Sequence, residues 1–279
     1  MGIRKIARKF LIFKWMFNTW RGTSVSLHKT LFFNLSAFDI RIALKFPVWI
    51  YQGTKIEHVG NIKINGETWR GMIRIGKRQF FRNSSTSIIN VGTMEFDGNC
   101  TILGGTIIHV LGEKSVIHFG KECMIGENSK ILVGSRIDIG DFTRIAFDSL
   151  IVSADFHYVI NITTGNVSRS FTPIKIGKYN WIGNNSVIKK GTVTPDYCIV
   201  SNGSMLSKDY SNEPLYTLIV GIPGKVKGYG YRRVYNDESS AELDAFFNAS
   251  DCKHKQIALK TTDLNYDWFC DGEIHVHSH

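Results

Sequence analysis

Hydrophobic residues recur every six positions between residues 96 and 209. Each unit starts with an aliphatic or aromatic residue, often followed by Gly or Asp, and carries a small residue four positions later. The residues expected to point inward are Phe96, Ile102, Phe119, Ile125, Val133, Ile139, Ile145, Ile176, Ile182, Ile188, Thr194, Val200 and Leu206. The small residues expected at corners are Cys100, Thr106, Cys123, Ser129, Thr143, Ser149, Asn180, Ser186, Thr192, Cys198 and Ser204. A period of six matches neither the helical repeat nor the alternation of a half-buried strand.

Such a period fits a three-sided prism in which each turn contains three short strands and three corners. We therefore predict an all-β fold, a parallel β-helix whose stacked coils lie about 4.8 Å apart. The stretch from Ile56 to Val91 is more loosely ordered and is interpreted as earlier coils, and residues 158–173 as a loop that interrupts the stack. Corner glycines are expected to adopt positive φ. Consecutive strands of an ordinary sandwich fit these in-register units poorly.

The patterns divide the chain into three parts, which are a basic amphipathic segment (residues 1–54), the β-helix domain (55–227) and a C-terminal extension (228–279). After residue 230 the charge reverses, with nine Asp or Glu against five Lys or Arg. Ser239 and Glu242 form a capping-box pattern that predicts a short helix through Phe247.

The net charge of +10 is concentrated at the N-terminus, where residues 1–45 hold nine Lys or Arg and the single acid Asp39. This polarity argues against a nucleic-acid groove along the fold and favours one cationic end that meets an anionic surface. In residues 1–21, apolar residues at helical spacing alternate with basic ones. Two interpretations stay open, a helix lying on a membrane or an amphipathic helix packed on its own domain.

The five cysteines lack the paired spacing of a zinc site or a disulfide framework, so we expect a reduced, cytosolic compartment and no metal. No apolar run approaches the roughly 18 residues of a membrane-spanning helix. The expected location is the cytoplasm, with peripheral contact on the inner face of the plasma membrane through residues 1–21.

Three motifs carry a resemblance to a known family. They are Asp155-Phe156-His157, then Pro173-Ile174-Lys175-Ile176-Gly177 with Asn180-Trp181-Ile182-Gly183, and Val220-Gly221-Ile222-Pro223-Gly224-Lys225-Val226. Over residues 25–230 the chain resembles the left-handed β-helix hexapeptide-repeat acyltransferases, which include the galactoside, maltose and surface-polysaccharide O-acetyltransferases. It departs from the family at Gly224, where Ala or Cys is usual, and at Thr194-Pro195-Asp196, which replaces an aliphatic-Gly pair.

The resemblance implies a left-handed coil, a homotrimer, and acetyl-CoA bound as co-substrate in a cleft between neighbouring subunits. It implies coenzyme contacts at Trp181, Asn184, Asn202, Ser207, Lys208 and Lys225. Lysine ammonium groups can pair with the coenzyme's phosphates. The resemblance also implies a substrate contact at Asn128, and an oxyanion donor among the backbone N–H groups of the glycine corners.

Acyl transfer from a thioester to a hydroxyl requires a base for the alcohol proton. His157 is the candidate, because a neutral imidazole accepts a proton near pH 7 without a metal. Asp155 shares a face of the extended chain with His157, and two roles stay open for it, orienting the ring or capping a corner. No P-loop, GxGxxG motif or serine nucleophile elbow is present, so no acyl-enzyme is needed. His109 and His118 lack the spacing of the γ-class carbonic anhydrases, which share this fold.

The predicted function is acetyl-CoA-dependent O-acetyl transfer to a sugar hydroxyl of a surface polysaccharide or of its lipid-linked precursor. Two alternatives remain. An amino-sugar N-acetyltransferase would use the same scaffold with a different acceptor pocket. An inactive trimeric β-helix would serve as a scaffold or binding module.

Overall fold

The computed structural model describes residues 24–80, 85–249, 253, 256, 257, 259 and 265–272. Contacts divide the chain into two units, Met1–Gly230 and Tyr231–His279. The amphipathic segment predicted at residues 1–21 lies outside the described residues, as does Cys252. Among the helices in the described ranges, none has the length and apolar character needed to span a bilayer.

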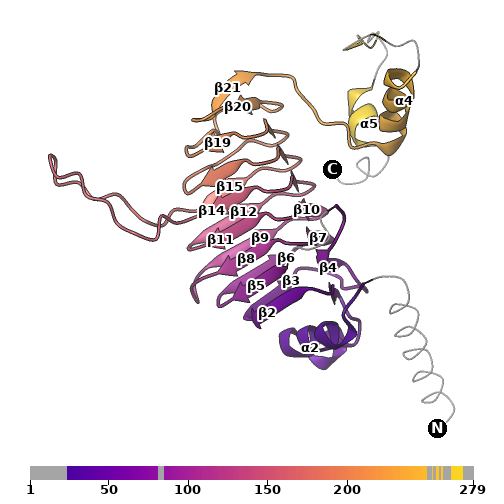
Figure 1. The fold of residues 1–279 in the computed structure, drawn as a ribbon, viewed down its shortest axis with the longest axis vertical. Coiled ribbons are helices and arrows are strands. Elements are labelled where there is room, and N and C mark those ends of the chain that lie inside the picture. Colours follow the sequence, from indigo (N-terminus) through magenta and orange to yellow (C-terminus); the bar gives the residue numbers. More distant parts are fainter. Residues whose placement is uncertain are drawn as a thin grey trace. The chain divides into compact units, whose positions relative to one another are not determined.

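The first unit is a prism with three parallel sheets (Figure 1). The nine-stranded sheet contains β1 (Val48–Ile50), β4 (Ile73–Lys77), β7 (Cys100–Leu103), β10 (Cys123–Ile125), β13 (Arg144–Ile145), β16 (Trp181–Ile182), β18 (Ile199–Val200), β20 (Leu218–Val220) and β21 (Lys225–Gly228). The seven-stranded sheet contains β2 (Thr54–His58), β5 (Thr86–Asn90), β8 (Ile107–Val110), β11 (Lys130–Val133), β14 (Leu150–Val152), β17 (Val187–Lys189) and β19 (Met205–Leu206). The five-stranded sheet contains β3 (Asn61–Ile64), β6 (Thr93–Phe96), β9 (Val116–Phe119), β12 (Arg136–Ile139) and β15 (Ile174–Ile176).

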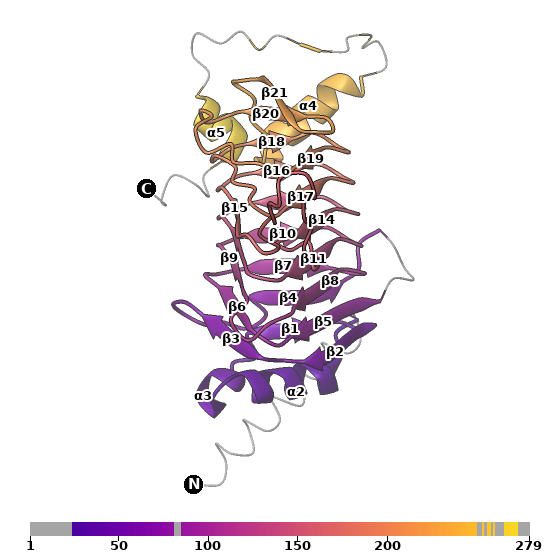
Figure 2. The same ribbon diagram turned by 90° about the vertical axis from the view of Figure 1, so that its left-hand side faces the viewer.

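The chain contributes one strand to the nine-, seven- and five-stranded sheets in turn, and three such strands make one coil. Figures 1 and 2 together show that the coils wind in a left-handed sense. Among the strands of the described residues, pairing is parallel with the coil above and below, except for the final pair, β20 and β21, which is antiparallel. The predicted left-handed parallel β-helix is therefore confirmed. Its coils begin at β1, so the looser stretch from Ile56 to Val91 belongs to the first two coils.

The core of the prism is the predicted ladder of inward residues. All thirteen inward positions from Phe96 to Leu206 are buried, and so are all eleven small corner residues. In the strand register Ile125 lies between Ile102 below and Ile145 above. Each apolar side chain thus packs against its equivalents in the neighbouring coils, which removes them all from water.

The expected role of the corner glycines is wrong for those that directly follow an inward residue in the regular coils. Gly126, Gly140 and Gly183 have no positive φ, whereas the left-handed corner positions hold residues such as Asn128 and Phe142, with φ of 60° and 57°. A Cβ on Gly140 would lie 2.6 Å from the backbone of Gly177 in the next coil. The close approach of successive coils, rather than backbone conformation, therefore requires these glycines.

Replacing Gly140 by Ala is expected to lower the free energy of unfolding by about 1–3 kcal/mol, because the added methyl group would push two hydrogen-bonded coils apart. Gly203→Asn is the matched control, since Gly203 has φ +67° and nothing within 4 Å of an added Cβ. Asn tolerates that conformation, so the control should change stability by less than about 0.5 kcal/mol. Urea denaturation of the full chain measures both, and equal stability of the two variants would contradict the contact argument.

Two helices cover the N-terminal end of the prism, α2 (Leu27–Ala37) and α3 (Ile40–Ala43) (Figure 2). The Asn34 side chain bonds the strand edge twice, accepting from Val48 N–H at 3.2 Å and donating to Val48 O at 2.7 Å. Thr30 Oγ1 accepts from Ile50 N–H at 3.0 Å. These side chains satisfy the open edge of β1, where no further coil pairs with it. Residues 27–44 are called the α2–α3 cap below.

The second unit contains α4 (Asp237–Phe247) and α5 (Tyr266–Asp271). The helix predicted through Phe247 is present, but the capping box is not its start. Asn236 is the N-cap, and its side chain accepts the N–H of Glu238 at 3.0 Å. Ser239 lies inside the first turn and is buried. Asparagine three residues upstream satisfies the helix N-terminus first, which leaves Ser239 within the helix.

Candidate active site

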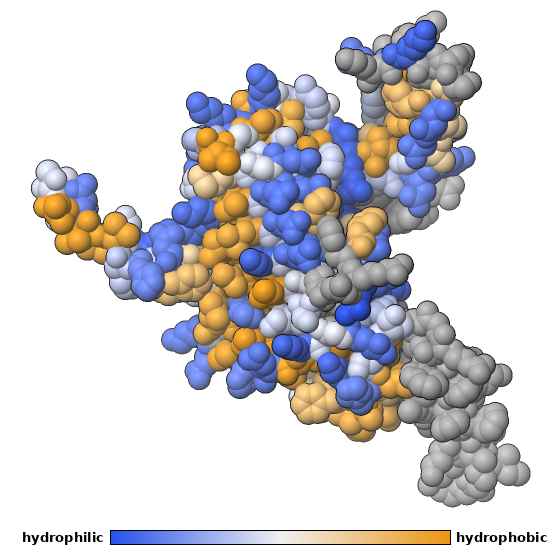
Figure 3. Space-filling view, viewed as in Figure 1, coloured by the Kyte–Doolittle hydropathy of each residue, from blue (hydrophilic) through white to orange (hydrophobic). Residues whose placement is uncertain are grey.

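An arm interrupts the fifth coil between β14 and β15. Antiparallel bridges join Ala154 to Phe171 and Ile160 to Val167, so residues 155–170 run out and back, away from the prism (Figure 1). The loop predicted at residues 158–173 falls here. The arm exposes large apolar side chains, and Figure 3 shows apolar surface at its tip. The most exposed are Tyr158, Val159, Ile160, Ile162 and Val167.

His157 lies at the root of the arm and is exposed. With the residues that the structure describes, His157 makes no hydrogen bond or ion pair, so its ring is available to a reactant. Asp155, predicted either to orient this ring or to cap a corner, pairs with Lys190, at 2.7 Å between Oδ2 and Nζ. Lys190 also donates to the backbone carbonyl of Arg169. Lys190 therefore holds both sides of the arm's root.

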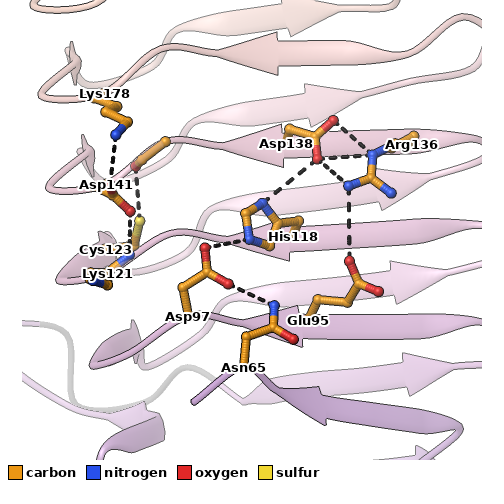
Figure 4. A network of polar contacts seen from close by, with 11 residues as sticks. Asn65, Glu95, Asp97, His118, Lys121, Cys123, Arg136, Asp138, Asp141 and Lys178 are labelled. Carbon is orange, nitrogen blue, oxygen red and sulfur yellow. Dashed lines mark hydrogen bonds and ion pairs between the residues drawn. The ribbon is translucent and has the colours of Figure 1, made fainter.

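The histidines of the repeats have other surroundings. His118 Nε2 lies 2.8 Å from Asp97 Oδ2, and its Nδ1 lies 3.7 Å from Asp138 Oδ1 (Figure 4). Arg136 pairs in turn with Asp138 at 2.6 Å. His109 lies 3.3 Å from the hydroxyl of Ser87, and burial lowers the pKa of His109. These imidazoles belong to side-chain ladders on the outer faces of the sheets.

Trp181 starts β16 and faces outward from the nine-stranded sheet, with 37% of its surface exposed. Its register neighbours are Arg144 in the coil below and Ile199 in the coil above. Ile182 takes the inward position beside it and is fully buried. The preceding Asn180 is a corner residue, donating to Pro195 O at 2.8 Å. The indole ring thus lies on the outer surface, where a ligand can reach it.

Six of the proposed site residues lie on two edges of the prism, whereas Trp181 and Lys225 lie in strands of the nine-stranded sheet. Asn128, Asn184 and Asn202 follow strands of the nine-stranded sheet and precede strands of the seven-stranded sheet, so they share one edge. His157, Ser207 and Lys208 follow strands of the seven-stranded sheet and share the next edge. Within one chain the seven-stranded sheet lies between the two groups. The fold therefore brings the members of each group to one edge, but it does not bring the two groups together within one chain.

Several of these side chains have partners within the chain. Asn202 Oδ1 accepts the backbone N–H of Asn184 at 3.0 Å, which ties two coils together. Lys208 Nζ lies 5.1 Å from the centroid of the Tyr210 ring. Lys208 and Lys225 are both exposed. Two exposed ammonium groups near the C-terminal coils suit the phosphates of a coenzyme.

An aromatic ladder on the third edge was not predicted. The ring centroids lie 4.8, 4.5 and 5.1 Å apart in order; the first two pairs are stacked and the last pair is tilted by 50°. The residues are Phe142, Tyr179, Tyr197 and Tyr216. Each immediately precedes a buried small corner residue and has positive φ. The recurrence of an aromatic residue directly before the small residue is the sequence signal that identifies the ladder.

The cysteines in the described ranges are poor nucleophiles. Burial raises the pKa of Cys123 to about 12 and that of Cys198 to about 12. Burial also raises the pKa of Cys100. Thiols of this kind hold little thiolate at neutral pH. Across the described part of the chain, no three His, Cys, Asp or Glu residues are grouped so that they could hold a metal ion.

The strand pairing and the six-residue core define a left-handed hexapeptide-repeat β-helix. No family model and no curated protein matches the chain. Among solved structures, it is similar to the polySia specific acetyltransferase NeuO, with 18% identity over 74% of this chain and 89% of that chain and a TM-score of 0.44. It is also similar to the polysialic acid O-acetyltransferase OatWY, with 18% identity over 69% of this chain and 98% of that chain and a TM-score of 0.36.

A third similar structure is that of AntD, an N-acyltransferase from Bacillus cereus, in complex with dTDP and 3-hydroxybutyryl-CoA. The identity is 18% over 76% of this chain and 96% of that chain, with a TM-score of 0.36. At these identities, the fold of the chain rests on its own strand pairing.

Proposed function

We propose that this protein is an acetyl-CoA-dependent O-acetyltransferase that modifies a sugar hydroxyl of a surface polysaccharide or of its lipid-linked precursor. The observation that carries the proposal is the exposed His157 at the root of the arm, on the same edge of the prism as the exposed Ser207 and Lys208 of a later coil. Within the described residues this imidazole has no hydrogen-bond or ion-pair partner, so it can accept the proton of an alcohol, and the ammonium group on its edge can contact a phosphate of the coenzyme.

The proposed reaction is a direct transfer. His157 accepts the hydroxyl proton while the sugar oxygen forms a bond to the thioester carbonyl carbon. The tetrahedral intermediate then collapses, the carbon–sulfur bond breaks, and the imidazolium returns the proton to the coenzyme sulfur. The products are an acetyl ester and coenzyme A, and no acyl-enzyme is formed. A backbone N–H at a glycine corner is the proposed donor to the oxyanion.

The proposed assembly is a homotrimer with acetyl-CoA between neighbouring subunits. Such an arrangement would bring the edge with His157 in one copy to the edge with Asn184 and Asn202 in the next. The arm supports it, because Ile162 is 91% exposed and Tyr158 is 72% exposed in a single chain. A contiguous exposed apolar surface marks an interaction site in many proteins. Trp181, Ser207, Lys208 and Lys225 are the remaining proposed coenzyme contacts, and Asn128 the proposed substrate contact.

Release of coenzyme A tests the proposal. The purified full chain is incubated with acetyl-CoA and a panel of sugars that offer either hydroxyl groups alone or a free amino group. We expect thiol release that depends on a hydroxyl acceptor, with an acetylated product that mild base deacylates, because an ester hydrolyses where an amide survives.

The outcomes separate the three hypotheses. A base-stable product formed only on amino sugars would replace O-transfer by N-transfer. Absence of both coenzyme A binding and thiol release would favour the scaffold.

We further propose a location at the cytoplasmic face of the membrane through the basic residues 1–21.

A further inference from the structure

The α2–α3 cap has its polar and apolar sides reversed. The side chains that α2 buries include the polar Thr30 and Asn34, whereas Leu31, Phe32 and Leu35 are 45%, 59% and 48% exposed. At about 100° per residue, these three apolar residues fall within an arc of roughly 100° on the side away from Thr30 and Asn34. A surface helix ordinarily turns such a stripe toward the core.

The reversal follows from the position of α2 at the end of the prism. Its inward face must bond the open edge of β1, and the hydrogen bonds of Thr30 and Asn34 to Ile50 and Val48 do so. Phe33 alone joins the hydrophobic core from the middle of this helix. The outward Leu and Phe side chains add nothing to those contacts, and keeping them in water has a cost. They therefore indicate a surface that a partner covers.

The surroundings of this apolar surface are cationic. On α3 and just after it, Ile40 and Leu44 are 59% and 57% exposed, and Arg41 and Lys45 are also exposed. The one acid of the cap, Asp39, accepts the N–H groups of Arg41 and Ile42 and so serves as the helix N-cap. Residues 1–23 add six Lys or Arg and no acid. Apolar surface appears at this end of the prism in Figure 3.

We propose that the α2–α3 cap docks on a bilayer that contains anionic lipids. Leu31, Phe32, Leu35, Ile40 and Leu44 enter the interfacial region, and the neighbouring basic residues contact the headgroups. The arm is also apolar but carries only Asp155 and Arg169 as charged groups besides its histidine, so it has no basic excess. Charge complementarity therefore assigns the lipid surface to the cap and not to the arm.

Docking by the cap would set the distance of the candidate site from the bilayer surface. The arm leaves the fifth coil, four steps of about 4.8 Å above β1, which places the root of the arm roughly 20 Å above β1 along the prism. That height suits the sugar portion of a lipid-linked acceptor rather than the lipid itself. This consequence rests on the proposed function, whereas the docking itself does not.

Vesicle flotation of the full chain tests the docking. The variant Leu31→Ser/Phe32→Ser/Leu35→Ser is compared with Val91→Ser/Leu111→Ser/Leu215→Ser, whose residues are 43%, 43% and 49% exposed elsewhere on the prism. Vesicles are phosphatidylcholine with and without phosphatidylglycerol. We expect the wild type and the control variant to float with the anionic vesicles. The cap variant should bind these vesicles at least about tenfold more weakly.

Two further variants keep the outcome decisive. If thermal unfolding shows that the triple cap variant is unfolded, Ile40→Ser/Leu44→Ser gives the same comparison outside the hydrophobic core. Deletion of residues 1–21 should weaken flotation without abolishing it. Adding the cap substitutions to this deletion should then remove the remaining vesicle binding. Undiminished flotation of a folded cap variant, or a change in its oligomeric mass with unchanged flotation, would overturn the proposal. Coenzyme A release with a soluble acceptor is measured alongside and should be unaffected, so failure of the docking leaves the proposed acyl transfer intact.

Discussion

Replacing His157 by Ala is expected to lower kcat for acetyl transfer by about 10²–10⁴-fold, the usual contribution of a positioned general base. The affinity for coenzyme A should stay nearly unchanged, because the proposed coenzyme contacts lie in the coils after the arm. Folding should also be unaffected, since His157 is exposed and makes no hydrogen bond or ion pair within the described residues. Thiol release from acetyl-CoA gives kcat, and calorimetry with coenzyme A gives the affinity.

His109→Ala is the matched control. His109 also lies on the outside of the prism, where it contacts Ser87, but it belongs to a coil before the arm. Its removal should leave kcat close to that of the wild type. Full activity of His157→Ala would refute the base assignment, whereas equal losses in both variants would indicate damage to the fold rather than to the chemistry.

The repeat predicts the inside of this protein well because the same contacts recur in every coil. Once Ile125 and Ile145 are in register, the period fixes which residues of the following coils point inward. Burial of Ser129 and Thr143 follows from the same rule, since only small side chains fit at the corners. These assignments need local spacing alone and no knowledge of distant contacts.

The features that the sequence missed depend on contacts between distant residues. Asp155 is two positions from His157, but its partner Lys190 comes from the next coil. The polarity of α2 is reversed because β1 has an open edge, which only the complete stack defines. Gly140 is required by the backbone of Gly177, again one coil away. Spacing identifies a residue's place in its own coil, whereas these roles are set by neighbouring coils.

The distribution of the candidate site residues has the same origin. The motifs identify His157 and Asn202 individually, but the corner that each follows decides its edge of the prism. Those edges flank the seven-stranded sheet, so the proposed site would be completed by a second copy of the chain. The catalytic proposal and the trimer proposal are therefore linked, and a chain that remains monomeric while turning over substrate would contradict the linkage.

Replacing Phe119 by Ala is expected to lower the free energy of unfolding by about 3–5 kcal/mol, as for other fully buried aromatic side chains. Phe119 is 0% exposed, and its ring stacks on that of Phe96 in the coil below, with the centroids 5.1 Å apart. Ile139 lies above it in the register, and Gly120 N–H donates to Ile139 O at 2.8 Å. Because backbone hydrogen bonds hold the coils at a fixed spacing, the core cannot collapse to fill the cavity.

Phe80→Ala is the control for this change, because it removes the same atoms from a side chain that is 71% exposed. Its effect should stay within about 0.5 kcal/mol. Urea denaturation followed by circular dichroism measures both variants. Since each coil is stabilised chiefly by its immediate neighbours, the Phe119 variant should also unfold over a broader range of urea. A loss as small as that of the control would mean that the coils relax into the space, which contradicts a rigid ladder of stacked side chains.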